Sequence, residues 1–118
     1  MKKAGWNIVA RNYGTSGGEL DIVAFRKGVL AFVEVKTRSN SSFGTPAEAV
    51  DAKKQARVKN AAAGFIYEQM TNGRLPVYSR LLRRRVPKRV KKCRFDIAEV
   101  YMTRDTEVRD IVLREDCF

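Results

Sequence analysis

Four charged side chains, Glu19, Asp21, Glu34 and Lys36, have the types and spacing that could do chemistry. They fall two positions apart within two apolar runs, the spacing that places side chains on one face of a β-strand. Two carboxylates held opposite each other repel, by up to about 1 kcal/mol on a strand pair, unless a positive charge lies between them. Oxygen ligands without histidine or cysteine favour Mg²⁺ or Mn²⁺, and water bound to such an ion can attack a phosphodiester bond.

The chemistry that this set predicts is hydrolysis of nucleic acid. Asp21 and Glu34 would hold the metal ion, while Lys36 would orient or deprotonate the attacking water and stabilise charge on the phosphate. A structural alternative stays open. In that case Glu19 forms a cross-strand ion pair with Lys36, and the other two carboxylates lie at a solvated strand end.

The set depends on a hairpin formed by residues 19–25 and 29–37. Both runs are rich in β-branched and aromatic residues, and Arg26-Lys27-Gly28 separates them. A two-residue loop at positions 27 and 28 would set the two carboxylates opposite each other, and Glu19 opposite Lys36, with all four on one face. A loop with an odd number of residues would put the carboxylates on opposite faces, so the shared site depends on the register.

The other elements predict an α/β fold, because the hairpin runs are apolar at nearly every position and indicate a central sheet covered by helices. Thr45-Pro46-Ala47-Glu48 is a capping box that predicts a helix start, and Asn72-Gly73 is a suitable stop. Apolar residues recur between them at helical spacing: Val50, Val58, Ala61, Ala62 and Phe65.

Two further strands are predicted, at residues 6–12 and 95–101, while residues 110–113 fit either a short strand or a helical turn. The glycine-rich run at 14–18 lies between the first two strands. It lacks the spacing of phosphate-binding loops, and no helix signal follows it. We therefore interpret it as a strand connection.

A basic segment carries nearly all of the net charge. The chain has 24 Lys and Arg against 13 Asp and Glu, a formal charge of +11. Ten of the bases and none of the acids lie from Arg74 to Arg94. Such segregation predicts an arm that binds a polyanion, since closely spaced cations release counterions from a phosphate backbone. The alternative is a solvated loop, because Pro76 and Pro87 would break any long helix.

Few aromatic side chains in this segment could stack on bases, so the arm is expected to position nucleic acid rather than to read its sequence. The start of the predicted helix adds further bases. The expected nucleic-acid contacts are Lys53, Lys54, Arg57, Arg83, Arg84, Arg85, Lys88, Arg89, Lys91 and Lys92.

The composition excludes several classes of site. With no histidine, the chain has no Ser-His-Asp or Cys-His nucleophile system and no zinc site that needs imidazole. Cys93 and Cys117 lack CxxC spacing and are expected to be free thiols in a reducing compartment. No apolar run approaches the roughly 20 residues that span a bilayer, and no secretory signal follows Met1. We expect one cytoplasmic domain over residues 1–118, with no membrane partner.

Several short motifs carry a family resemblance. The strand pair contains Gly-Glu-Leu-Asp-Ile-Val-Ala at 18–24 and Phe-Val-Glu-Val-Lys-Thr-Arg at 32–38. Outside the strand pair the motifs are Gly5-Trp6, Arg11-Asn12, Phe43-Gly44, Pro46, Glu48, Ala49 and Arg94-Phe95-Asp96. In order and spacing they resemble the YraN family of bacterial proteins, over most of the chain up to about residue 70 and the later strand.

The YraN family is similar to the Holliday-junction resolvases and, more broadly, to the PD-(D/E)xK nucleases. The resemblance implies a restriction-endonuclease-like core, with a central mixed sheet and an antiparallel hairpin flanked by helices. It implies that Asp21 and Glu34 are metal ligands, Lys36 the catalytic lysine and Glu19 an accessory acid. The implied activity is that of a Mg²⁺- or Mn²⁺-dependent, structure-selective endonuclease on branched or duplex DNA. Symmetric cleavage of a junction would need a homodimer.

Two features depart from the family pattern. Such proteins usually begin with a helix whose glutamate helps to complete the metal site, whereas this sequence starts at Met1, just before Gly5-Trp6. The basic segment at about 74–93 is an insertion to which the resemblance assigns no role. The alternative prediction is therefore a non-catalytic nucleic-acid-binding module on a nuclease fold, and a protein-interaction role is a third. The choice between DNA and RNA stays open.

Overall fold

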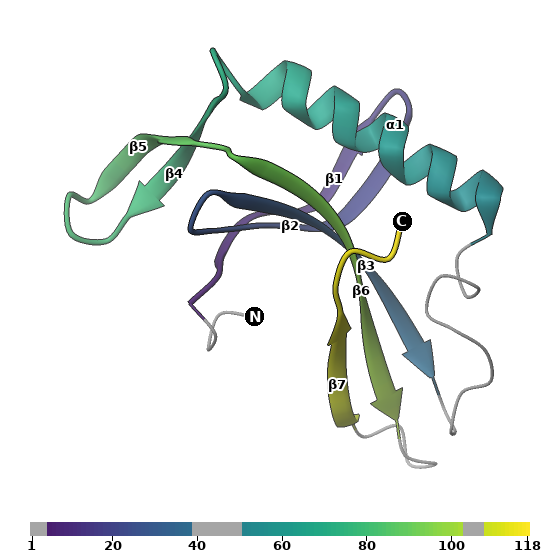
Figure 1. The fold of residues 1–118 in the computed structure, drawn as a ribbon. Helices are drawn as coiled ribbons and strands as arrows, with labels where there is room; N and C mark the ends of the chain where they lie inside the picture. Colours follow the sequence, from purple (N-terminus) through teal and green to yellow (C-terminus); the bar gives the residue numbers. More distant parts are fainter. Residues whose placement is uncertain (1–4, 39–50, 103–107) are drawn as a thin grey trace.

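The computed structural model describes residues 5–38, 51–102 and 108–118, which form seven strands and one helix (Figure 1). In chain order the elements are β1 (Asn7–Thr15), β2 (Gly18–Arg26), β3 (Val29–Arg38), α1 (Ala52–Gln69), β4 (Arg74–Ser79), β5 (Arg84–Arg89), β6 (Lys92–Met102) and β7 (Val108–Arg114). The four predicted strands are confirmed, and the tail that fitted two interpretations is the strand β7. The predicted capping box lies outside the described residues.

Five of the strands form one mixed sheet in the order β1-β2-β3-β6-β7. The central pair β3 and β6 is parallel, and the other pairs are antiparallel. The crossover between the parallel strands contains α1, which lies across one face of the sheet (Figure 1). This mixed sheet with a central antiparallel hairpin is the α/β nuclease-like core that the sequence predicts.

The β2–β3 hairpin closes with the two-residue loop that the sequence analysis assumed. Arg26 pairs with Val29, and both loop residues have positive φ, +47° at Lys27 and +83° at Gly28. Two positive φ values match the twist of the flanking strands in a type I′ turn. The register that brings Asp21 toward Glu34 therefore begins as predicted.

The helix covers the larger of two apolar clusters. The predicted apolar positions Val58, Ala61, Ala62 and Phe65 are all buried. The ring of Phe65 meets that of Phe32 of β3 edge-on, with centroids 5.9 Å apart. Packed faces of this kind, rather than helix propensity, supply most of the stability of a helix of this length.

The opposite face of the sheet carries a smaller cluster of Trp6, Ala24, Ala31, Val33 and Ala98. Among the described residues α1 is the one helix, and it lies on the other side of the sheet. Small side chains account for much of this face. The described residues contain no helix long and apolar enough to cross a membrane.

The glycine-rich run is a strand connection, as predicted, and it packs closely on α1. Gly18 begins β2 with φ +148°, and a Cβ there would lie 3.1 Å from the carbonyl oxygen of Arg57. From the helix, a Cβ on Gly64 would lie 3.0 Å from Cβ of Thr15. These contacts set the distance between the helix and the β1–β2 turn.

The basic segment is a second, two-stranded sheet rather than a loop. β4 and β5 form an antiparallel hairpin in which Pro76 faces Pro87. Opposed prolines fit a non-hydrogen-bonded pair of the ladder, since proline has no N–H to donate. Leu75 and Val77 are buried in the main core, so one face of the hairpin is anchored while its bases stay exposed.

The Arg94-Phe95-Asp96 motif ties the C-terminal residues to β6. Arg94 donates two hydrogen bonds of 2.9 Å to the fully buried Asp96, one to each carboxylate oxygen. These bonds raise the pKa of Arg94, so its guanidinium group stays charged. Asp96 also accepts from the N–H of Asp116, and Phe118 stacks on Phe95. The motif therefore has a structural role.

We predict that Gly18→Ala will lower the free energy of unfolding by about 1–3 kcal/mol. The new Cβ would meet a backbone oxygen of α1, in a backbone conformation that non-glycine residues rarely adopt. Urea unfolding followed by circular dichroism measures the change. Gly14→Ala is the matched control, because a Cβ at Gly14 has nothing within 4 Å. Equal unfolding midpoints for the two variants would contradict the close approach.

Candidate functional site

The ladder between β2 and β3 ends part-way along both strands. Its last pair is Ile22 and Val33; beyond it β2 continues beside β1, and β3 continues beside β6. The N–H of Val35 donates to Oδ2 of Asp21 at 2.9 Å. A side chain thus takes the place of a main-chain acceptor, and Asp21 lies where the two strands part.

Glu34 is a buried carboxylate in the same region. Only 4% of its surface is exposed. Glu34 lies two residues after Phe32 and therefore on the same face of β3, which is the face that α1 covers. Burial is the main cause that raises its pKa, and the negative charge of Asp21 raises it further. The Nζ of Lys54, 3.2 Å from Oε1, and the charge of Lys36 act in the opposite direction. The pKa of Glu34 still lies above its ordinary value.

Lys36 lies two residues after Glu34 on β3, so the two side chains share one face of the strand. Lys36 is half-buried, and its positive charge favours the ionised form of Glu34. The structure therefore brings three of the four predicted residues, Asp21, Glu34 and Lys36, into one electrostatic neighbourhood.

Glu19 does not join them within the described part of the chain. It pairs with Gly14 of β1 and is exposed, while the next residue, Leu20, is buried in the cluster under α1. Because neighbouring residues of a strand face opposite sides, Glu19 lies on the side away from the helix. The expectation that all four side chains point to one face is thus corrected at Glu19.

The cause lies in β1. Asn12 has φ +48°, a left-handed conformation that asparagine tolerates, and the strand pairs on either side of it are Arg11 with Ile22 and Tyr13 with Leu20. The regular alternation is lost at this point, opposite Asp21. Consistent with that loss, no ion pair joins Glu19 to Lys36 in the part of the chain that the structure describes, so the cross-strand alternative is also not observed.

The donor set fits a magnesium-like cation. Asp21 and Glu34 offer carboxylate oxygens, and their mutual repulsion raises the pKa of Glu34, which a divalent cation between them would relieve. Mg²⁺ commonly uses one or two protein carboxylates and completes its shell with water and phosphate oxygens. Within residues 5–38, 51–102 and 108–118, no group of three or more acidic or cysteine side chains could hold a metal.

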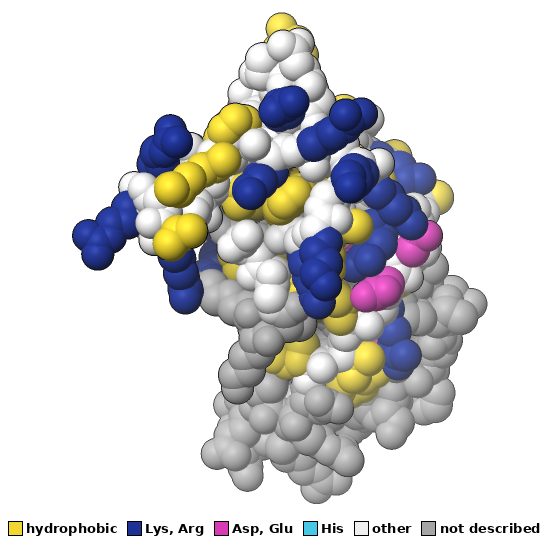
Figure 2. All heavy atoms as spheres, turned by 60° about the vertical axis from the view of Figure 1, so that its left-hand side comes forward, with side chains coloured by type: hydrophobic (Ala, Val, Ile, Leu, Met, Phe, Trp, Pro, Cys, Tyr) yellow, Lys and Arg dark blue, Asp and Glu magenta, His cyan; other side chains and the backbone are white. Residues whose placement is uncertain are grey.

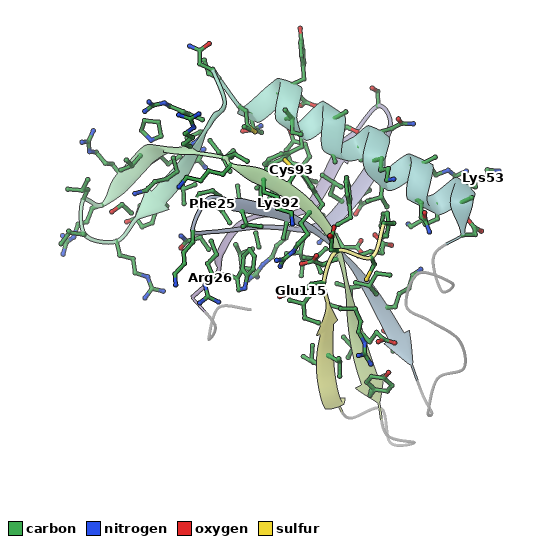
Figure 3. The ribbon with its side chains drawn as sticks, viewed as in Figure 1. Phe25, Arg26, Lys53, Lys92, Cys93 and Glu115 are labelled. Carbon is green, nitrogen blue, oxygen red and sulfur yellow. The ribbon has the colours of Figure 1, made fainter. Side chains whose placement is uncertain are left out.

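The predicted nucleic-acid contacts divide into two groups. Lys54 is paired with Glu34 and so belongs to the acidic site, a role that the sequence analysis missed because it depends on how the helix packs. The rest are exposed, and Lys53 lies at the start of α1, away from the β4–β5 hairpin (Figure 3). Figure 2 shows Lys and Arg side chains gathered with hydrophobic ones over the hairpin side of the molecule.

A search of protein families gives a match to the uncharacterised protein family UPF0102 over residues 1–100, a range that includes the acidic site, α1 and the β4–β5 hairpin. The chain belongs to the UPF0102 family. UPF0102 is the YraN family, so the resemblance seen in the motifs is confirmed.

Similar UPF0102 proteins cover much or all of the chain. The protein of Caldicellulosiruptor saccharolyticus is 37% identical over 120 residues, which span 100% of this chain and 86% of the relative. That of Dictyoglomus thermophilum is 38% identical over 110 residues, 93% of this chain and 79% of the relative. That of Carboxydothermus hydrogenoformans reaches 48% identity over 68 residues, 58% of each chain.

We predict that Lys54→Met will raise the pKa of Glu34 further, since the variant loses a hydrogen bond and a positive charge that favour the carboxylate. NMR titration of the glutamate carboxyl carbons measures the shift. Lys53→Met, one residue earlier and exposed, is the control and should leave the titration of Glu34 unchanged. Identical Glu34 titration curves for the two variants would rule out the ion pair.

The raised pKa of Glu34 also makes the free energy of unfolding depend on pH. The folded protein holds the proton of Glu34 more tightly than the unfolded chain does, so protonated Glu34 contributes to the stability of the fold. This stabilisation is complete below the ordinary pKa of 4.5 and is lost as the pH rises through the raised pKa of the folded protein. In Lys54→Met the loss should extend to higher pH, and urea unfolding at a series of pH values would detect it.

Proposed function

We propose that this UPF0102 chain is a metal-dependent endonuclease that hydrolyses phosphodiester bonds of structured DNA, using Mg²⁺ or Mn²⁺. The observation that carries the proposal is the pair of adjacent carboxylates, Asp21 and Glu34, with Lys36 beside them where β2 leaves β3. The same strand pair resembles that of the PD-(D/E)xK nucleases.

Each of the three residues has a distinct role in the proposal. A divalent cation held by Asp21 and Glu34 would act as a Lewis acid on the phosphate and lower the pKa of a bound water. Lys36 would direct its Nζ toward the scissile phosphate, orient the attacking water and offset negative charge that develops on the phosphate oxygens. The hydrogen bond from Val35 fixes the orientation of the Asp21 carboxylate.

Lys54 would change partner during this cycle. In the structure it neutralises Glu34, and a cation bound at Glu34 would compete with it for the same carboxylate. Released from Glu34, a lysine with 41% of its side chain exposed is free to contact a phosphate of the substrate. Lys54 then contacts nucleic acid, as expected from the sequence, but only after it has exchanged Glu34 for a phosphate of the substrate.

The exposed bases of the β4–β5 hairpin would supply sequence-independent affinity for DNA. Among the predicted contacts, seven belong to the hairpin and the start of β6, and all seven are exposed: Arg83, Arg84, Arg85, Lys88, Arg89, Lys91 and Lys92. Contacts to phosphates position a protein on nucleic acid without reading the bases. Symmetric cleavage of a four-way junction would also require two copies of the chain.

A second candidate function is nucleic-acid binding without catalysis. The Lys54–Glu34 ion pair favours it, since the pair already balances the buried carboxylate without a metal. In that case the acidic site stabilises the fold, and the basic hairpin alone contacts nucleic acid.

We predict that Lys36→Ala will lower the rate of Mg²⁺-dependent cleavage by at least about 100-fold, the contribution of a positioned proton-transfer or charge-stabilising group. Cleavage of a four-way junction, a flap and a plain duplex should be measured beside DNA affinity, which should change by less than about 2-fold. Glu68→Gln, an exposed acid near the other end of α1, is the control and should cleave normally. Wild-type cleavage by Lys36→Ala would remove the activity from this site.

Calorimetric titration with MgCl₂ and MnCl₂ separates the two candidates. Metal binding by the wild type that is lost in Asp21→Asn, together with cleavage, supports the nuclease. DNA binding with neither metal binding nor cleavage supports the binding module instead.

We predict a steep salt dependence of DNA binding, with log K falling by about 0.9 per log unit of salt for each phosphate engaged. If about half of the ten bases from Arg74 to Arg94 take part, the slope is roughly −4 to −5. Replacing Arg84, Lys88 and Arg89 by alanine should reduce the slope by about 2–3, as fluorescence anisotropy can show. A flat salt response would exclude the hairpin as the DNA contact.

A further inference from the structure

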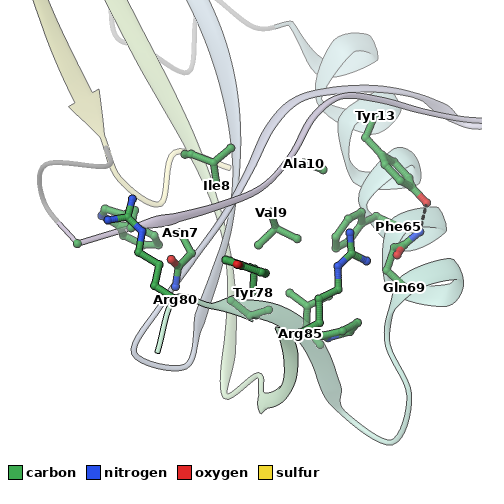
Figure 4. Close-up of a pocket in the computed structure, with 15 residues that line it drawn as sticks. Asn7, Ile8, Val9, Ala10, Tyr13, Phe65, Gln69, Tyr78, Arg80 and Arg85 are labelled. Carbon is green, nitrogen blue, oxygen red and sulfur yellow. Dashed lines mark hydrogen bonds between the residues drawn. The ribbon is translucent and has the colours of Figure 1, made fainter. Parts of the chain in front are cut away.

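A groove of about 800 Å³ lies between β1 and the β4–β5 hairpin, outside the acidic site (Figure 4). Part of its lining is apolar and comes from Ile8, Val9, Ala10, Phe65, Leu75 and Val77. The hairpin adds three side chains with polar or charged ends, Tyr78, Arg80 and Arg85. The groove therefore combines an apolar wall with positive charge.

Tyr78 is the aromatic side chain that the hairpin offers to this groove. Its side chain is 57% exposed, and in the view of Figure 4 it lies between Arg80 and Arg85. An exposed aromatic ring flanked by guanidinium groups is the arrangement on which unpaired bases stack while their phosphates bind the cations. A paired duplex presents phosphates but keeps its base faces covered, so it would leave the apolar lining unused.

A second, smaller pocket of about 450 Å³ continues the positive charge. It shares Gly5 and Asn7 with the groove. Five cations from the β2–β3 turn and the end of the hairpin line it: Arg26, Lys27, Lys88, Arg89 and Lys91. No Asp or Glu lines either hollow among the described residues, which suits the backbone of a nucleic acid.

We infer that the groove binds a single-stranded segment of nucleic acid, with unpaired bases stacked on Tyr78 and phosphates held by Arg80, Arg85 and the adjoining basic pocket. This inference rests on the proposed binding of nucleic acid and specifies its substrate. The exposed ring of Tyr78 offers a face on which a base can stack, and Arg80 and Arg85, which line the same groove, offer cations for the phosphates beside that base.

The position of the groove constrains the substrate further. Gln69 lines the groove near the end of α1, whereas Lys54 contacts Glu34 near its start. At 1.5 Å per residue these two positions lie about 22 Å apart along the helix. That distance corresponds to roughly six or seven stacked nucleotides at 3.4 Å each. The favoured substrate is therefore a flap or fork, with a single strand in the groove and the cleavage point several nucleotides away.

The test compares affinities of a labelled 20-nucleotide oligo-dT and a duplex of the same length, by fluorescence anisotropy at fixed salt. Tyr78→Ala should weaken binding of the single strand by about 5- to 100-fold, the range of one lost stacking contact, and binding of the duplex by less than 2-fold. Tyr78→Phe should restore single-strand affinity. Tyr67→Ala is the matched control, because Tyr67 is 89% exposed on α1 and does not line the groove.

Several outcomes would overturn the inference. They are an unchanged single-strand affinity in Tyr78→Ala, an equal loss for single strand and duplex, or an equal loss in Tyr67→Ala. The first would favour an extended peptide beside β1 as the occupant. Metal-dependent cleavage is measured separately from binding. If Tyr78→Ala weakens single-strand binding but no cleavage is found, only the proposed nuclease activity is refuted. If the protein cleaves DNA but Tyr78→Ala binds the single strand normally, only the proposed role of the groove is refuted.

Discussion

The separation of β2 from β3 after Ile22 and Val33 is the constraint on which the candidate site depends. β3 is held by ten residue pairs to β6, whereas β2 follows β1 toward the turn that packs under α1. β2 and β3 part at this point, and a main-chain amide that loses its ladder partner costs about 1–3 kcal/mol if it stays buried and unsatisfied. Asp21 accepts from that amide at Val35, so one carboxylate serves both the fold and the candidate chemistry.

The sequence predicts those parts of this arrangement that depend on neighbouring residues in the chain, and it does not predict those that depend on contacts between distant elements. The hairpin register followed from a two-residue loop and is confirmed from Arg26–Val29 as far as Ile22–Val33, although the predicted pairs of Asp21 with Glu34 and of Glu19 with Lys36 are not part of the ladder. The helix face followed from a 3.6-residue period and is confirmed. Glu19 was misplaced because the alternation breaks at Asn12, on the neighbouring strand, where a single positive φ is hard to anticipate. The partner of Lys54 was equally out of reach, because a contact between a helix and a strand depends on tertiary packing.

The basic segment shows the opposite case. Its prolines and closely spaced charges argue against regular structure, yet β4 and β5 pair along their whole length. Two apolar residues, Leu75 and Val77, anchor the hairpin in the main core and outweigh the weak strand propensity of the rest. The charge was visible in the sequence, whereas the groove beside β1 appears only once the hairpin is docked. The buried Glu34 and the exposed bases of the β4–β5 hairpin lie near opposite ends of α1.

The way α1 is fixed has a mechanical consequence. Its buried side chains begin at Val58, and its close contacts with the β1–β2 turn lie between Arg57 and Gly64. The first turn and a half carries the cap at Asp51 and the Lys54 ion pair. The buried part of the helix therefore begins after the residue that forms the ion pair with Glu34. Lys54 can therefore exchange one ionic partner for another without unpacking the side chains that are buried from Val58 onward.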